Sequence, residues 1–230
     1  MAKSRSGKAP HMESLNENIS DVQRLLTIAA KTSSHTDKKI LRNGAIVLFT
    51  ASWEAFIEDL ADASFKFLSK NAKTHNKLPI SVKRHVAKKI NVGKDPLQLW
   101  LLADSGWKTV LKKHGKSIIE NWIGPLNTPN YKRVDDMFEC LIGLKNLSNE
   151  WQWSGISAKD VKKKLDRYID LRGQIAHRNS ADQTIKTGLV YEYTEFIYRL
   201  AVRSHNTTRK HLFNQTKKMP WNSYSFKKTH

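Results

Sequence analysis

Two side chains late in the sequence, Arg172 and His177, have the chemistry needed to cleave RNA. An imidazole gives or takes a proton near neutral pH, and a guanidinium stays charged and neutralises a phosphate. Four residues separate the pair, late in a helical pattern. Similar spacings occur twice more, at Arg5 with His11 and at Arg199 with His205. The surroundings favour the first pair, because a polar loop follows it at residues 179–182.

Three stretches of the sequence carry a resemblance to a known family. They are residues 53–60, residues 128–131 and residues 171–179, which include Arg172 and His177. Together they resemble the HEPN superfamily, and most nearly its RiboL-PSP-type domains, from about residue 15 to about residue 213. The resemblance implies an α-helical bundle and a metal-independent endoribonuclease of the toxin or phage-defence kind. One departure is Gly173, where many members carry Asn or another polar residue; it motivates the alternative of a non-catalytic HEPN module that binds RNA or a partner protein.

In the predicted reaction, His177 deprotonates a ribose 2′-hydroxyl or protonates the leaving 5′-oxygen, and Arg172 binds the phosphate. The product would end in a 2′,3′-cyclic phosphate, with no metal and no cofactor. Arg178 is adjacent and is either a further phosphate contact or an ordinary exposed arginine. The competing interpretation pairs Arg172 with Asp166 or Asp170 and leaves His177 as a cap of the helix end.

Helix geometry separates the two side chains of the motif. Five steps of about 100° place Arg172 and His177 about 140° apart on a straight helix, so they would not face one phosphate. One solution is that Gly173 disrupts the helix. The other, implied by the HEPN resemblance, is a homodimer whose two motifs line one cleft and form a composite active site.

Glu54 is a further candidate site residue, because it lies between Trp53 and Phe56 in the most apolar helical segment. A buried carboxylate needs a partner, and Arg172 or His177 would supply one. The resembling family also has an acidic residue at this position. Alternatively, Glu54 faces solvent together with Glu58, four residues on.

The net charge of +19 predicts a polyanionic partner. No acidic residue lies between Asp62 and Asp95 or after Glu195. We expect RNA contacts from four basic residues of the first block, namely Lys83, Arg84, Lys88 and Lys89. A solubilising surface, membrane phospholipid or an acidic protein are the other interpretations of this charge. An antitoxin or regulatory protein is a further expected partner.

The composition favours a globular protein of the cytoplasm. Hydrophobic residues make up 39% of the 230 residues, enough for a core. The single cysteine, Cys140, excludes an internal disulfide and is expected to be buried and inert. No apolar run is predicted to span a bilayer, and no signal peptide is recognised, so no membrane partner is expected.

The periodicity of apolar residues predicts one all-α domain at residues 12–213, an antiparallel helical bundle. Helices are expected at about 15–30, 37–71, 79–90, 131–147, 157–177 and 184–213, with another starting near residue 96. Residues 72–126 are interpreted as a helical insertion or cap. Residues 1–11 are taken as a tail or expression tag. Residues 214–230 form a basic, aromatic tail that stacks on nucleic acid, stays disordered or packs against the body.

Overall fold

The computed structural model describes residues 7–90, 94–124, 129–178 and 185–226, and leaves out the side chains of His177 and Arg178. Over these ranges the chain is all-α, as predicted, with no strand beyond two isolated bridges. The α-helices are α1 (Pro10–Lys31), α2 (His35–Asn71), α3 (Ile80–Lys89), α4 (Gly106–Ile123), α5 (Tyr131–Ile142), α6 (Ala158–Arg178) and α7 (Thr187–Thr216). Three short 3-10 helices join them: η1 (His75–Lys77), η2 (Pro96–Leu102) and η3 (Leu147–Glu150).

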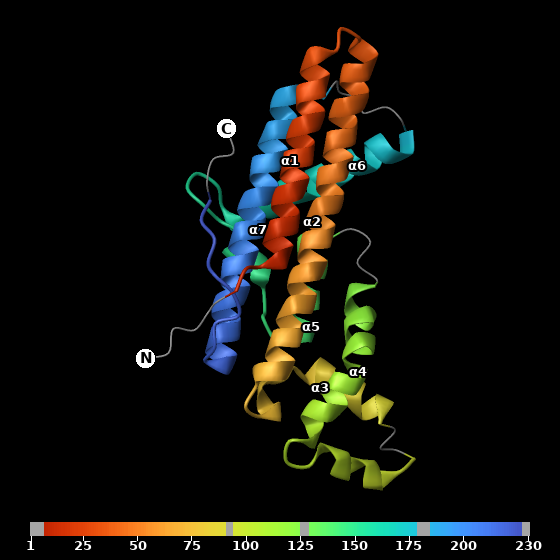
Figure 1. The fold of residues 1–230 in the computed structure, drawn as a ribbon, viewed down its shortest axis with the longest axis vertical. Coiled ribbons are helices and arrows are strands. Elements are labelled where there is room, and N and C mark those ends of the chain that lie inside the picture. The colour runs from red at the N-terminus through yellow and green to blue at the C-terminus, as the bar shows by residue number, and fades with distance from the viewer. Residues whose placement is uncertain (1–6, 91–93, 125–128, 179–184, 227–230) are drawn as a thin grey trace.

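The helix α2 is the centre of the bundle. It packs along α1, and α7, α5, α6 and α4 contact it as well (Figure 1). Ser34 starts it by accepting a hydrogen bond from the Asp37 backbone N–H, an N-cap that satisfies one otherwise unpaired donor. Contrary to the sequence-based expectation, α2 is long and apolar enough to cross a membrane by length and composition. Its apolar residues are nevertheless buried largely against the other helices.

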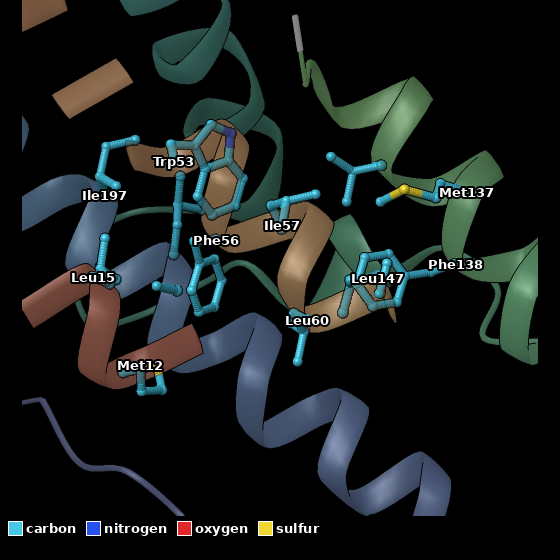
Figure 2. Packing of buried hydrophobic residues seen from close by; sticks show 14 of the residues in the cluster. Met12, Leu15, Trp53, Phe56, Ile57, Leu60, Met137, Phe138, Leu147 and Ile197 are labelled. Atoms are coloured by element: carbon cyan, nitrogen blue, oxygen red, sulfur yellow. The ribbon is translucent and has the colours of Figure 1, made fainter. Parts of the chain in front are cut away.

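Large aromatic side chains fill the middle of this core. Trp53 and Phe56 of α2 are almost fully buried and stack with ring centroids 5.9 Å apart. Figure 2 shows them surrounded by side chains of α1, α5, η3 and α7. Burial of aromatic rings of this size contributes strongly to stability, so the segment next to Glu54 is held rigidly.

The helices η1, α3, η2 and α4 follow α2 in order and fall within residues 72–126, the range in which the sequence predicts a helical insertion or cap. They lie at one end of the long axis, whereas α6 crosses α2 nearer the other end (Figure 1). The insertion therefore does not cover α6.

The first described residues belong to the fold, which differs from the tail expected for residues 1–11. The helix α1 starts at Pro10, and Ala9, His11 and Met12 are buried. Gly7 forms an isolated bridge with Trp221. Residues 7–11 are therefore packed against the C-terminal segment at Trp221.

The aromatic residues near the C-terminus pack against α7, one of the three outcomes left open by the sequence. The Asn206 side chain exchanges two hydrogen bonds with the backbone of Tyr224, at 2.8 and 3.1 Å. The Arg199 guanidinium lies 3.7 Å from the ring centroid of Phe226, and Trp221 is buried. These rings are engaged within the chain, so they do not form a free stacking surface.

Candidate functional site

The Arg172 motif lies on an uninterrupted helix. Ser157 caps α6 by accepting a hydrogen bond from the Asp160 N–H at 3.2 Å. The α-helical backbone then continues through Gly173 to Arg178. The expectation that Gly173 disrupts the helix is therefore wrong. Arg172 and His177 are separated by about 140° around the helix and about 7.5 Å along it.

Arg172 is half-buried and lies near residues of two other helices. One is Glu54 of α2, the carboxylate singled out from the sequence. Burial raises the pKa of Glu54, and the nearby Arg172 guanidinium opposes that rise. Arg172 and Glu54 therefore lie within electrostatic range of each other, but they form no ion pair within the described residues. The Glu54 charge in turn raises the pKa of Glu58 further.

The other neighbour of Arg172 is Tyr193 of α7, which is fully buried. Burial raises the pKa of Tyr193, and the Arg172 charge lowers it. The Tyr193 hydroxyl lies 2.7 Å from Thr50 Oγ1. Since Thr50 donates its own proton to the Ile46 carbonyl, Tyr193 must be the donor to Thr50. The phenol is therefore fixed, and its remaining lone pairs can face a cation.

An aromatic stack supports this arrangement from within α6. The Tyr168 ring, one turn before Arg172, stacks on Tyr193 with centroids 4.0 Å apart. Tyr168 and Tyr193 were not predicted from the sequence to be neighbours of Arg172. The signal available was that a buried tyrosine hydroxyl requires a partner, which the polar Thr50 in an apolar run supplies.

The acidic neighbours expected in the competing interpretation lie elsewhere on α6. Asp166 and Asp170 line a hollow of about 310 Å³ together with Tyr131 and Lys132. Burial, and then the charge of Asp170, raise the pKa of Asp166. Within the described part of the chain, Arg172 forms no ion pair with either aspartate. Its electrostatic neighbours are Glu54 and Tyr193 instead.

The turn before α5 is tied to the same part of α2. The Trp53 indole donates a hydrogen bond of 3.2 Å to the Pro129 carbonyl. Asn130 then caps α5 by accepting from the Arg133 N–H at 3.1 Å. The two stretches 53–60 and 129–131 therefore meet in space, one residue away from Glu54.

Four of the predicted RNA-binding residues lie on another helix than Arg172. Lys83, Arg84, Lys88 and Lys89 lie on α3 in the insertion, toward the opposite end of the molecule from the C-terminal end of α6 (Figure 1). The side chains of His177 and Arg178, and all of Asn179, lie outside the described residues. No group of three or more His, Cys, Asp or Glu that could hold a metal ion is found in the described ranges.

Comparison with known protein families shows to which family this chain belongs. The model of the RiboL-PSP-HEPN family matches residues 13–209, which include Glu54, Arg172 and Tyr193. The chain belongs to the RiboL-PSP-HEPN family. HEPN proteins are typically ribonucleases, so the match is consistent with a role on RNA. No curated protein and no solved structure gives a significant match to this HEPN chain.

Proposed function

We propose that this HEPN protein is a metal-independent endoribonuclease in which Arg172 and His177 act on the scissile phosphate. The observation that supports it best is the setting of Arg172. The guanidinium is half-buried beside the Glu54 carboxylate and the fixed Tyr193 hydroxyl, on three different helices. No hydrogen bond or ion pair joins Arg172 to either of them among the residues that the structure describes, so the guanidinium is available to bind charge that develops in a transition state.

The proposed reaction is an internal transesterification. His177 accepts the proton of a ribose 2′-hydroxyl, and the 2′-oxygen forms a bond to phosphorus. The bond from phosphorus to the 5′-oxygen breaks, and that oxygen takes a proton from an imidazolium. The products are a 2′,3′-cyclic phosphate and a 5′-hydroxyl. Arg172 neutralises the charge on the phosphoryl oxygens, and Glu54 holds Arg172 in place.

We further propose that the site is composite, from two copies of the chain. With α6 helical throughout, Arg172 and His177 of one copy diverge by about 140°. A twofold axis near the C-terminal end of α6 would bring two arginines and two histidines to one cleft. Mixing a His177→Ala chain with an Arg172→Ala chain tests this. Recovered activity in the mixture supports a shared site, and full activity of a dilute monomer contradicts it.

The direct test of the activity is the chemistry of the product ends. Total RNA incubated with the protein in EDTA should give fragments with cyclic phosphate and 5′-hydroxyl ends. His177→Ala should give none, whereas His75→Ala, a change of an exposed histidine in η1, should cleave as the unchanged protein does. Fragments with 3′-hydroxyl ends would contradict the proposed chemistry.

A second candidate function is a non-catalytic HEPN module, favoured by Gly173. A Cβ at this position would meet nothing within 4 Å, so a polar residue fits there without displacing a neighbour. The Gly173→Asn variant therefore separates the two candidates. RNA binding without cleavage by the native protein, with cleavage by Gly173→Asn, would select the module.

The biological role that we propose for the ribonuclease is that of a toxin or phage-defence effector, held in check by an antitoxin or regulatory protein. Expression of the native chain should then arrest bacterial growth, and His177→Ala should relieve the arrest. Equal toxicity of the two chains at equal protein level would refute this role.

A further inference from the structure

A second hollow lies far from Arg172, between the C-terminal half of α2 and the insertion helix α4. Its volume is about 1010 Å³. The floor is apolar and includes Phe65 of α2 with Leu111 and Ile119 of α4. Phe65 and Leu111 are only 2% and 3% exposed, so the floor is rigid. Figure 1 shows α4 beside this part of α2.

Two rows of lysines border the apolar floor. Lys66 and Lys70 stand on α2, and Lys108, Lys112 and Lys116 stand on α4. Residues four apart share one face of a helix and follow each other at about 6 Å, so each row runs along the groove.

The charge of these rows is only partly neutralised. Lys66 pairs with Asp62 at 2.6 Å, and Lys116 pairs with Glu120 at 3.6 Å. Lys70 and Lys112 form no ion pair within the described ranges. Both rows therefore present cations to whatever enters the groove.

Two further residues of the groove walls are Gly115 and Ser69. Gly115 lies on its α4 wall, where a Cβ would meet only the Phe65 ring, at 3.9 Å. Glycine in a helix interior is less favourable than alanine, so Gly115 lowers the stability of α4. It also leaves space in the groove that a larger side chain would fill. On the α2 side, the Ser69 hydroxyl is buried and has no hydrogen-bond partner among the described residues.

We propose that this groove binds an acidic amphipathic helix of a partner protein. Asp62 and Glu120 also line the groove, but five lysines outnumber them. An apolar floor with lysines on both walls is complementary to a helix with one apolar stripe and acids on both edges. From Lys108 to Glu120 the α4 wall is about 18 Å long, room for about three turns of such a helix. Its acids would face Lys70 and Lys112.

Other occupants fit this geometry less well. A single-chain lipid anion has one charged end and would meet only one lysine of the rows. RNA would match the lysines, but the aliphatic side chains of Leu111 and Ile119 on the floor offer no aromatic face on which a base could stack. A second copy of the chain would bring another +19 of like charge toward the rows.

The experiment uses a fluorescein-labelled helical peptide of about 18 residues, with leucines on one face and glutamates on both edges. Fluorescence anisotropy near physiological salt measures its affinity for the whole protein. A peptide of the same composition with its leucines spread around the helix is the control. The amphipathic peptide should bind and the control should not.

Two matched pairs of variants locate the binding. Lys112→Glu should weaken it by about tenfold, because it places like charges together. Lys113→Glu, at an exposed neighbour outside the groove, should leave it unchanged. Gly115→Leu should abolish binding by filling the groove, and Gly115→Ala should not, since its Cβ has ordinary contact distance to Phe65. Melting curves of all four confirm their folding.

Three results would overturn the proposal. One is equal binding of the control peptide, which would show only attraction to a basic surface. Another is an equal effect of Lys112→Glu and Lys113→Glu, or none from Gly115→Leu. The third is that the amphipathic peptide does not bind, whereas oleate or a single-stranded RNA binds and loses its binding in Gly115→Leu.

Discussion

Acid should destabilise this protein strongly through one buried pair, His11 and His205. The two imidazoles are 2% and 0% exposed and lie 2.9 Å apart, Nε2 of His11 to Nδ1 of His205. His205 Nε2 lies 2.7 Å from the Asn222 carbonyl and must donate to it. The neutral His205 therefore accepts at Nδ1, and His11 donates there.

Protonation disrupts this arrangement. A proton on His205 Nδ1 would face the N–H of His11, and no acid pairs with either ring in the described structure. Burial lowers the pKa of His11 to about 3, helped by the charge of His205. Burial likewise lowers the pKa of His205 to about 4, against the bond to Asn222.

The sign and size of the effect follow from linkage. In the unfolded chain both histidines titrate near 6.5, so below that pH the unfolded state binds protons that the folded state excludes. The stabilisation is thus present above pH 6.5 and is lost as the pH falls toward the folded pKa values. Between pH 6.5 and about 4.5 each histidine should contribute about 2 kcal/mol of lost stability.

The assay is urea denaturation at pH 7 and at about pH 4.5, for the native chain and for His11→Gln with His205→Gln. Carboxylates titrate in both proteins and cancel in the comparison. The native chain should lose about 4 kcal/mol more than the double variant over this interval. His35→Gln, at an exposed histidine, is the control and should behave as the native chain. An equal pH-dependent loss in the native and double-variant proteins would refute the reasoning.

Four further predictions concern the proposed site and the basic surface. His177→Ala should abolish RNA cleavage yet keep the fold, as activity assays beside circular dichroism would show; cleavage at the native rate would exclude His177. Arg172→Lys should slow cleavage by about a hundredfold, because lysine lacks the planar two-point contact, and an unchanged rate would place the phosphate elsewhere. Burial raises the pKa of Glu54, so its charged form costs stability at pH 7 and Glu54→Gln should raise the melting temperature there. This increase should vanish below pH 4.5, where Glu54 is protonated in the unfolded chain as well; an increase that does not change with pH would contradict the prediction. RNA affinity should fall steeply as the salt concentration rises, and a flat salt titration would assign the charge to another partner. Charge reversal at Lys83, Arg84, Lys88 and Lys89 should lower the slope of log affinity against log salt by about 0.7 for each phosphate that the variant no longer neutralises. The same variant should cleave bound RNA at the native rate.

The sequence predicted the helices well wherever a cap and an apolar stripe coincide. Ser34 and Ser157 cap the helices expected at about residues 37–71 and 157–177. The helix expected over residues 131–147 was too long, because α5 ends at Ile142. Gly143 there adopts φ of 75°, a left-handed conformation that stops a helix, while Leu147 prolonged the apolar pattern beyond it.

The pair that spacing alone also offered, Arg199 with His205, has a structural role. Arg199 pairs with Glu195 at 2.8 Å and covers Phe226, and His205 is buried. Neither the cover over Phe226 nor the burial of His205 is visible in the sequence, because both depend on the C-terminal segment folding back along α7. The same holds for the candidate site. The sequence predicted that Glu54, if buried, needs a partner. The hydrogen bond between Tyr193 and Thr50 joins residues 143 positions apart, so it can be recognised only from the fold.

The bridge between Gly7 and Trp221 brings a residue near the start of the described chain next to one near its end. Segments at opposite ends of the polypeptide are neighbours, so a short peptide could join them and new ends could be opened elsewhere with the packing preserved. The exposed turn at Gly155, between η3 and α6, is a suitable place to open it. In such a circular permutant His11 and His205 would be closer in sequence than they are in the native chain, and α6 would begin near the new N-terminus.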